Sequence, residues 1–197
     1  MAEIPAISDV PFGSPDIIRE LKLAVDTLAG RIGGNVDYGT IDGVRTKVLD
    51  IVHLCNMGRI KARAYRDAAQ NIDANGHTKV AIDTISFDTE NVIDIANSRI
   101  IPNLPGDYVV MGNVRAIAVP DGRRVNALIY KNGALATYGT IDYQGAEGLS
   151  SSSASDLIYM NGTTDYLELY ATNNHSSALA LYVGGSRQNY ISIVGPF

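Results

Sequence analysis

The spacing of hydrophobic residues changes near residue 60. Before Met57, apolar residues recur every three or four positions, which is the period of one face of an α-helix. From Lys61 onward, apolar and polar residues alternate, or apolar residues form short runs that turn residues interrupt. The pattern therefore predicts a short helical region followed by a larger region built of β-strands.

Two short helices are predicted in the N-terminal region. The first begins at Ser14-Pro15-Asp16, where Ser14 can cap and Pro15 suits the first turn, and it ends at Gly33-Gly34. The second covers residues 42–57. Each spans about two heptads, a length at which an isolated helix is marginal in water. Their apolar stripes therefore need a partner, which is either the rest of this chain or further copies of it.

The segment before the first helix, residues 2–13, combines prolines with regularly placed apolar side chains. Prolines favour an extended path, and the segment is too short to fold alone. One interpretation is a disordered tail. The other is a peptide that docks on a partner protein, because apolar side chains are costly in a tail that contacts only water. The prolines and apolar residues are Ile4, Pro5, Ile7, Val10, Pro11 and Phe12.

The C-terminal region is predicted to consist of short β-strands. Its content of Thr, Val, Ile and Tyr is typical of strands, and dipeptides of the hairpin type begin at Asn75, Asp121, Asn132 and Asn161. Many short strands at this spacing indicate an antiparallel sandwich. The predicted strands are residues 78–82, 84–88, 108–119, 124–130, 134–140, 155–160, 166–171, 178–183 and 189–194.

Several of these strands are apolar on both faces. The strand at residues 108–119 runs apolar with almost no break, and "SDLIYM" and "ALALYV" behave alike. A sandwich covers only one face of each sheet, and burying a large aliphatic side chain is worth roughly 1.5–3 kcal/mol. Eleven tyrosines, against three phenylalanines and no tryptophan, fit surfaces that are partly apolar and partly hydrogen-bonding. We therefore expect this region to associate with copies of itself.

Charge and composition narrow the classes of partner. A net charge of −5 argues against nucleic acid, because phosphate contacts need clustered Lys and Arg. No run reaches the roughly 18 consecutive apolar residues that membrane insertion requires. The start of the sequence shows no signal peptide, and the single cysteine, Cys55, excludes an intrachain disulfide. We therefore expect synthesis in the cytoplasm.

Candidate catalytic residues are few. His53 and Cys55 are two residues apart on a predicted helix, so they point to different sides. His77 and His175 follow or lie in polar turns and are interpreted as solvated loop histidines. The run at residues 150–153 is interpreted as a flexible serine loop, since no base lies near it in sequence.

Carboxylates offer one candidate metal site. Asp83, Asp88 and Asp94 could meet at one edge and hold a calcium ion, although solvated loop carboxylates are the simpler interpretation. A glycan-cleaving enzyme would need paired carboxylates in a cleft, and the sequence offers no particular pair. We therefore predict neither enzymatic activity nor a cofactor.

An ordered set of motifs in residues 65–197 resembles the jelly-roll domain of the complement-1q/tumour-necrosis-factor-like family. The family's Gly-Asp pair is here spread over Gly162 to Asp165, and the collagen stalk of the complement members is missing. The matching motifs, in chain order, are Phe87-Asp88, Ile100 to Pro102, Pro105 to Tyr108, Lys131 to Gly133, Leu157 to Leu169 and Tyr190 to Ile193.

The resemblance implies a homotrimer. Bacterial-virus members of the family cap fibres, needles and capsid projections, and the N-terminal leader with its short helix is similar to the start of some small tailed-phage structural proteins. The expected protein is a head fibre or capsid decoration protein of the virion. Residues 1–13 would anchor it to the major capsid protein or another virion protein, residues 14–60 would form a stem, and residues 61–197 an adhesive jelly-roll knob.

Each predicted part has its own contact residues. The anchor uses the proline and apolar residues of the leader given above. The expected stem contacts are Ile17, Leu21, Leu28, Val44, Val48 and Ile51. The expected fold or trimer contacts of the knob are Phe87, Tyr108, Val110, Leu128, Tyr130, Tyr159, Tyr166, Tyr170 and Tyr190. The knob's outer partner would be a glycan or protein of the host cell surface.

Two alternatives keep the same fold. The knob could instead belong to the tail, as a receptor-binding domain or as the tip of a needle or fibre. The capsid is favoured because the chain is short and lacks the long shaft expected of a tail fibre. A secreted signalling ligand of the same family would need the signal peptide that this sequence does not show.

Overall fold

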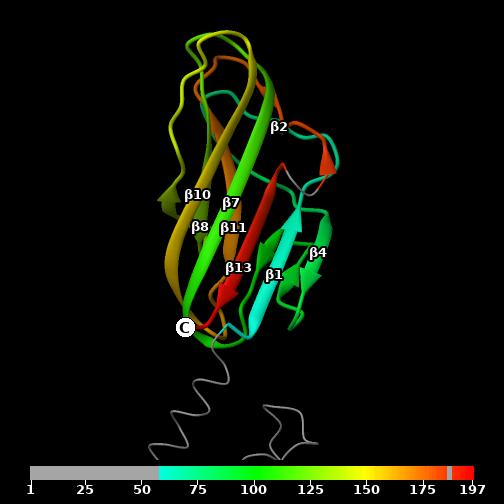
Figure 1. Ribbon diagram of the computed structural model, residues 1–197, viewed down its shortest axis with the longest axis vertical. Helices are drawn as coiled ribbons and strands as arrows, with labels where there is room; N and C mark the ends of the chain where they lie inside the picture. Colours follow the sequence, from blue (N-terminus) through cyan, green and yellow to red (C-terminus); the bar gives the residue numbers. More distant parts are fainter. Residues whose placement is uncertain (1–57, 186–187) are drawn as a thin grey trace, which may run out of the picture. The chain divides into compact units, whose positions relative to one another are not determined.

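Two antiparallel sheets face each other in the part of the chain that the computed structural model describes, residues 58–185 and 188–197 (Figure 1). The five-stranded sheet has the strand order β10-β7-β13-β1-β4. The predicted anchor, both predicted helices and the stem contacts lie outside the described residues. The strands of this sheet are β1 (Ile60–Tyr65), β4 (Thr84–Asp88), β7 (Pro105–Val119), β10 (Gly148–Asn161) and β13 (Tyr190–Gly195).

The second sheet is six-stranded, with the order β5-β6-β11-β8-β9 and β3 also paired to β11. A separate two-stranded sheet joins β2 (Asn71–Ile72) to β12 (Leu179–Ala180). The predicted antiparallel sandwich is confirmed. The strands of the six-stranded sheet are β3 (His77–Lys79), β5 (Ile93–Asp94), β6 (Arg99–Ile100), β8 (Val125–Lys131), β9 (Ala134–Tyr138) and β11 (Leu167–Asn173).

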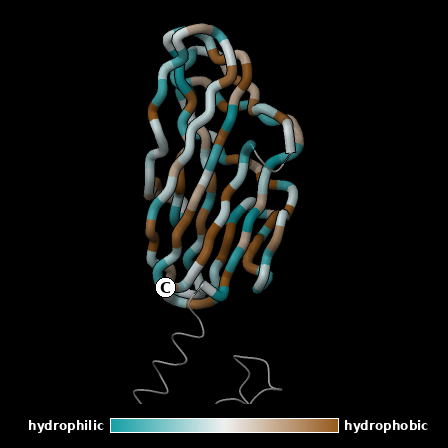
Figure 2. Tube along the Cα trace, viewed as in Figure 1, coloured by the Kyte–Doolittle hydropathy of each residue, from teal (hydrophilic) through white to brown (hydrophobic). Residues whose placement is uncertain are grey.

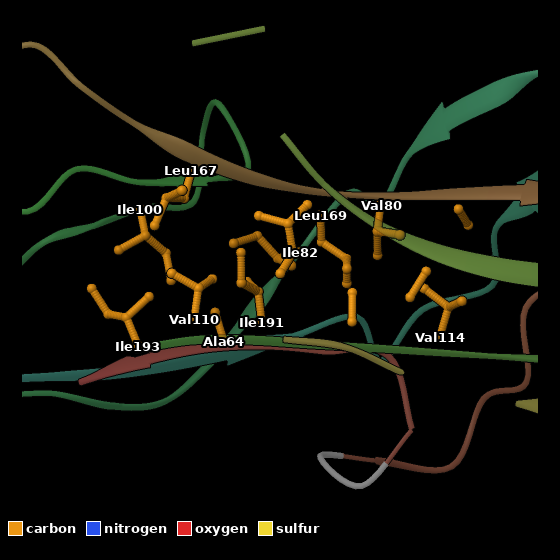
Figure 3. Packing of buried hydrophobic residues seen from close by; sticks show 14 of the residues in the cluster. Ala64, Val80, Ile82, Ile100, Val110, Val114, Leu167, Leu169, Ile191 and Ile193 are labelled. Carbon is orange, nitrogen blue, oxygen red and sulfur yellow. The ribbon is translucent and has the colours of Figure 1, made fainter. Parts of the chain in front are cut away.

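Alternation along the strands builds the core. Hydrophobic and hydrophilic residues succeed one another along most strands (Figure 2), because successive side chains point to opposite faces. Figure 3 shows the result, with Leu167 and Leu169 of β11 facing Val110 of β7 and Ile191 and Ile193 of β13 across the space between the sheets. The inward faces of β8 and β11 are thus the ones that carry Val125, Ala127 and Ile129, and Leu167, Leu169 and Ala171.

The serine run is a strand, and its interpretation as a flexible loop is wrong. β10 pairs with β7 from Gly148, opposite Val119, to Asn161, opposite Pro105. Ser152 is buried, and its Oγ donates to the carbonyl of Thr140 at 2.8 Å and accepts from the amide of Ala127 at 2.9 Å. Small hydroxyl side chains can face the core here because their hydrogen bonds are satisfied within it.

Three of the four expected hairpin dipeptides are not hairpins. Asn132 and Gly133 have φ of 53° and 74° and join the neighbouring strands β8 and β9, as a two-residue hairpin requires. The dipeptides at Asn75, Asp121 and Asn161 instead lie where the chain passes from one sheet to another. Turn chemistry is thus correctly predicted, but the strands that each turn joins are not.

The start and the end of the described chain lie together. The amide of Gly58 donates to the carbonyl of Pro196 at 2.7 Å, and the amide of Phe197 donates to the carbonyl of Asp107 at 3.0 Å. Asp107 is near the start of β7, whose 15 residues carry the chain about 45 Å to the other end of the sandwich. The loops after β7, β9 and β11 meet at that distal end, where Gly122 and Gln144 are hydrogen-bonded at 2.8 Å.

Candidate interaction surfaces

The outer face of the five-stranded sheet carries large apolar side chains that stay exposed in the described part of the chain. Along β10, the residues that alternate with the buried Ile158 and Met160 point outward, and Leu157 among them is 59% exposed. We call this surface the open face. Its exposed apolar residues are Phe87 of β4, Met111 and Ile117 of β7, and Leu149, Leu157 and Tyr159 of β10.

Polar groups on the open face are already paired within the protomer. Oδ1 of Asn113 accepts hydrogen bonds from Oγ of Ser153 at 2.9 Å and from Oγ of Ser151 at 3.3 Å. The guanidinium of Arg63 lies 3.9 Å from the ring centroid of Tyr190, which is a cation–π geometry. The interactions that the open face leaves unmade are therefore mainly apolar.

On the outer face of the six-stranded sheet, an apolar residue, Leu128, is covered by side chains of the same sheet. Leu128 alternates with the core residues Ala127 and Ile129, so it points outward, yet it is fully buried. Its cross-strand neighbours are Tyr170 on β11 and Tyr138 on β9. The rings of Tyr130 and Tyr170 stack, with centroids 4.0 Å apart.

His77 lies beside two of these tyrosine rings. Its ring meets those of Tyr130 and Tyr138 edge-on, at centroid distances of 6.1 and 6.3 Å, and its Nδ1 is hydrogen-bonded to Oη of Tyr130 at 2.5 Å. His77 is exposed, as expected of a solvated histidine, but it lies in strand β3 rather than in a loop, and β3 places it beside the aromatic rings. We call the surface formed by His77, Lys79, Leu128, Tyr130, Tyr138, Tyr166, Glu168 and Tyr170 the covered face.

A buried charge pair lies on the covered face. Nζ of Lys79 is 2.5 Å from Oε1 of Glu168, whose side chain is only 7% exposed. Oε2 of Glu168 has no hydrogen-bond partner in the described chain. Burial raises the pKa of the Tyr170 phenol, and the neighbouring Glu168 raises it further. Burial, followed by the nearby Tyr138, likewise raises the pKa of Tyr130.

The three aspartates considered for calcium do not form one site. Asp83 accepts the amides of Asp67 and Ala68 at 2.9 and 3.1 Å, Asp88 accepts the amide of Ile93 at 2.8 Å, and Asp94 pairs with Arg99 at 2.9 Å. Within residues 58–185 and 188–197, no three His, Cys, Asp or Glu side chains gather in a way that could hold a metal. The calcium interpretation is therefore wrong.

These carboxylates instead fasten turns. Burial alone would raise the pKa of Asp83, but the hydrogen bonds that it accepts outweigh burial and hold its pKa below the usual range. The hydrogen bond from Asn97 likewise lowers the pKa of Asp94. Both carboxylates are thus stabilised in their charged form by the backbone and side chains that they hold in place.

Asp165 joins two turns. Its Oδ1 accepts from Nδ2 of Asn132 at 2.8 Å, and its Oδ2 accepts from the amide of Asn161 at 3.0 Å and from Nζ of Lys131 at 2.9 Å. The hydrogen bond from Lys131 is the main cause that lowers the pKa of Asp165. In the segment Gly162 to Asp165, the aspartate therefore holds two turns together.

The nine predicted knob residues fall into three environments. Tyr108 and Val110 are in the core, where Oη of Tyr108 donates to the carbonyl of Leu104 at 2.9 Å. Phe87 and Tyr159 lie on the open face, and so does Tyr190, which differs from them because the guanidinium of Arg63 stacks on its ring. Leu128, Tyr130, Tyr166 and Tyr170 lie on the covered face, where Arg99 approaches the Tyr166 ring to 5.1 Å.

Sequence reasoning missed several residues of both faces. Leu157 had a signal, because "SDLIYM" is apolar on both faces of its strand. Met111 lies in the unbroken apolar run after Pro105 and could have been found in the same way. Tyr138, His77 and the Lys79–Glu168 pair had no local signal, since strands distant in the sequence bring them together.

Comparison with solved structures identifies the fold. The chain is 9% identical to the globular domain of zebrafish complement 1qA, covering 71% of this chain and 98% of that one with a TM-score of 0.50. For murine APRIL at pH 5.0 the values are 9%, 68%, 97% and 0.51, and for Eiger TNF from S. frugiperda they are 9%, 70%, 92% and 0.52. The predicted jelly roll of the complement-1q/tumour-necrosis-factor type is therefore confirmed as the fold.

The likeness extends to the fold alone at this level of identity. No family model matches the sequence, and the search of curated proteins returns no match. Among the described residues, no helix is long and apolar enough to cross a membrane. What the chain does must therefore be inferred from its surfaces.

Proposed function

We propose that this chain is an adhesive, non-enzymatic knob protein that forms a homotrimer through its open face. The observation that carries this proposal is the set of large apolar side chains exposed on one sheet of an otherwise well-packed sandwich. Burying each such side chain is worth roughly 1.5–3 kcal/mol, and contiguous exposed apolar residues mark association surfaces. Three copies arranged around a shared axis would cover the open face of each protomer.

The direction of the chain supports an anchored, outward-facing knob. Gly58 and the C-terminus lie at one end of the sandwich, whereas the loops after β7, β9 and β11 gather at the other. The described chain therefore begins at the end opposite these loops. In the proposed arrangement the N-terminal region attaches the trimer, and the distal loops and the sides of the knob face outward.

The proposed setting is a bacteriophage virion, with the protein as a head fibre or capsid decoration protein. Its support is the N-terminal sequence, in which a proline-rich apolar leader precedes two short amphipathic segments. The proposed partners are the major capsid protein or another virion protein at the anchor, and a host surface molecule at the knob. The described aspartates Asp83, Asp88, Asp94 and Asp165 hold turns, which agrees with a role without catalysis.

Light scattering after size exclusion tests the trimer. The full chain should elute at three times its mass of 21.1 kDa, and the mass should not depend on concentration in the micromolar range. A monomer would contradict the assembly through the open face.

Deletion of residues 2–13 tests the anchor separately. The shortened chain should still form soluble trimers, because the open face is intact, but these trimers should no longer join phage particles. Truncated trimers recovered on purified virions at the level of the full chain would refute the anchoring role.

A further inference from the structure

Glu168 has an incomplete set of hydrogen bonds on the covered face. Its side chain is more than nine-tenths buried, Lys79 occupies Oε1, and Oε2 has no donor within the described chain. Leaving a buried polar group unsatisfied costs about 1–3 kcal/mol, and more when the group is charged. Such groups are normally satisfied, by protein or by water. A donor from outside the described residues is therefore expected beside Glu168.

Tyrosine rings surround this carboxylate. Tyr130 lies directly across the strand pair from Glu168, and Tyr166 and Tyr170 lie two residues before and after it on the same face of β11. Tyr138, on the next strand but one, is 56% exposed. A tyrosine ring offers an apolar surface for packing and a hydroxyl for hydrogen bonding.

We propose that Glu168 and these four tyrosines form a binding site for a saccharide. The faces of a pyranose ring carry C–H groups that pack on tyrosine rings, and its rim carries hydroxyl donors. Oε2 of Glu168 is shielded from solvent in the free chain, so the neighbouring side chains shift on binding and one hydroxyl then donates to it, directly or through a bridging water. The proposal deepens the adhesive function proposed above and rests on it, since the saccharide would be the group on the cell surface to which the knob adheres.

The charges on the covered face favour a neutral ligand of this kind. Lys79 compensates Glu168, so a cationic ligand would meet a positive charge and an anionic ligand a buried carboxylate. Sugar hydroxyls need neither charge. A small-molecule site usually consists of a few well-placed polar groups among aromatic and other apolar side chains.

The position of the site is compatible with the proposed trimer. The covered face is the outer face of the six-stranded sheet, and the open face is the outer face of the other sheet, so the two surfaces point in opposite directions. Assembly through the open face therefore leaves the tyrosines of the covered face accessible to a ligand.

The test uses the full-length chain and four separate probes: methyl α-D-glucopyranoside, methyl β-D-galactopyranoside, methyl α-L-rhamnopyranoside and N-acetylglucosamine. Saturation-transfer NMR should show binding of at least one, and calorimetry then gives its affinity. Tyr138→Ala removes an exposed ring and should weaken binding about tenfold. Glu168→Gln keeps the shape of the side chain but replaces an accepting oxygen with a donor, and should weaken binding similarly.

Tyr143→Ala is the matched control. Tyr143 is 54% exposed, close to the value for Tyr138, but it lies in the distal loops, where Arg124 donates to its hydroxyl at 2.8 Å. This variant should bind the sugar as the unmodified chain does. Light scattering on the same samples reports the trimer, so loss of sugar binding by intact trimers is distinguishable from failure of assembly.

Two results would overturn the saccharide site. One is the absence of binding to all four probes, and the other is unchanged affinity in Tyr138→Ala. Adhesion to cells by trimers that bind none of the four sugars would assign the adhesive role to a protein ligand and equally reject the site.

Discussion

Two segments of nearly the same sequence differ in this fold in how far their leucine is buried. Leu128-Ile-Tyr-Lys-Asn-Gly133 and Leu157-Ile-Tyr-Met-Asn-Gly162 differ at one position. In both, the isoleucine points into the core and the leucine and tyrosine point outward. Leu128 is nevertheless fully buried, whereas Leu157 is 59% exposed. The first Asn-Gly closes a hairpin, and the second leads from one sheet to the other.

Strand neighbours explain this difference. β8 is an inner strand, so Leu128 has Tyr170 on one side and Tyr138 on the other. β10 is an edge strand, so Leu157 has a neighbour on one side only, Val109 of β7. The same tripeptide is thus covered by neighbouring strands in one sheet and left exposed in the other. Position in the sheet decides which of the two leucines its neighbouring strands cover.

The largest expected effect is on the mass of the assembly and comes from a change at Leu157. Leu157→Asp should convert the trimer to monomers, because each protomer would bury an unpaired carboxylate in an apolar interface, at a cost of several kcal/mol per charge. Light scattering measures the mass, and circular dichroism should show an unchanged β-sheet spectrum, since Leu157 makes little contact within the protomer.

Leu135→Asp is the control for this change. Leu135 is also an exposed leucine, but it belongs to β9 at the edge of the six-stranded sheet. The control should remain trimeric. Trimers of Leu157→Asp at micromolar concentration would show that the open face is not the interface.

Shortening the side chain of Leu128 should destabilise the fold without dissociating the trimer. Leu128→Ala removes a fully buried side chain and should lower the free energy of unfolding by about 2–5 kcal/mol, while a trimer would still form through the unchanged open face. The measurement is urea denaturation in the Leu157→Asp background, where unfolding is not linked to dissociation.

The matched change in the other segment is Leu157→Ala. Its free energy of unfolding is compared with that of Leu157→Asp at a protein concentration at which both variants are monomers. The two values should differ by no more than about 0.5 kcal/mol, as is usual for surface positions. Equal losses for the two leucines would contradict the contrast between a covered and an open face.

Sequence patterns predicted the features that depend on neighbouring residues along the chain. The sequence pattern correctly predicted strands at β8 and β11, and the dipeptide at Asn132 identified a hairpin. β1 was missed, because its inward residues include Ala62 and Ala64, whose small side chains give a weak hydrophobic signal. Ser152 was missed because its burial depends on partners in other segments, Thr140 and Ala127.

The candidate site was harder to predict than the fold. Tyr130 and Tyr170 were singled out, but the sequence could not show that they stack on each other or that β3 brings His77 and Lys79 beside them. Those contacts depend on strand order, which arises from pairing between segments far apart in the chain. An identical Leu-Ile-Tyr tripeptide on an edge and on an inner strand shows why local pattern alone cannot supply that order.

The last prediction concerns Asp165, which links the two Asn-Gly turns. Asp165→Asn should lower the free energy of unfolding by about 1.5–3 kcal/mol at pH 7, since it removes charge-assisted hydrogen bonds to Lys131, Asn132 and Asn161. Trimer mass should not change, because Asp165 is outside the open face. Chemical denaturation at a series of pH values measures the loss.

The pH dependence distinguishes this carboxylate from an ordinary one. Its pKa in the folded protein is held below the value of about 3.9 that an aspartate has in an unfolded chain, mainly by the hydrogen bond from Lys131. The stability that it supplies is therefore fully present above that unfolded value and is lost as pH falls through the folded pKa. The difference between Asp165→Asn and the unmodified chain should shrink from about pH 5 downward. The control Asp121→Asn, in an exposed turn, should leave the free energy of unfolding at pH 7 unchanged. A loss at Asp165 that persisted unchanged to pH 3 would mean that shape, not charge, joins the two turns.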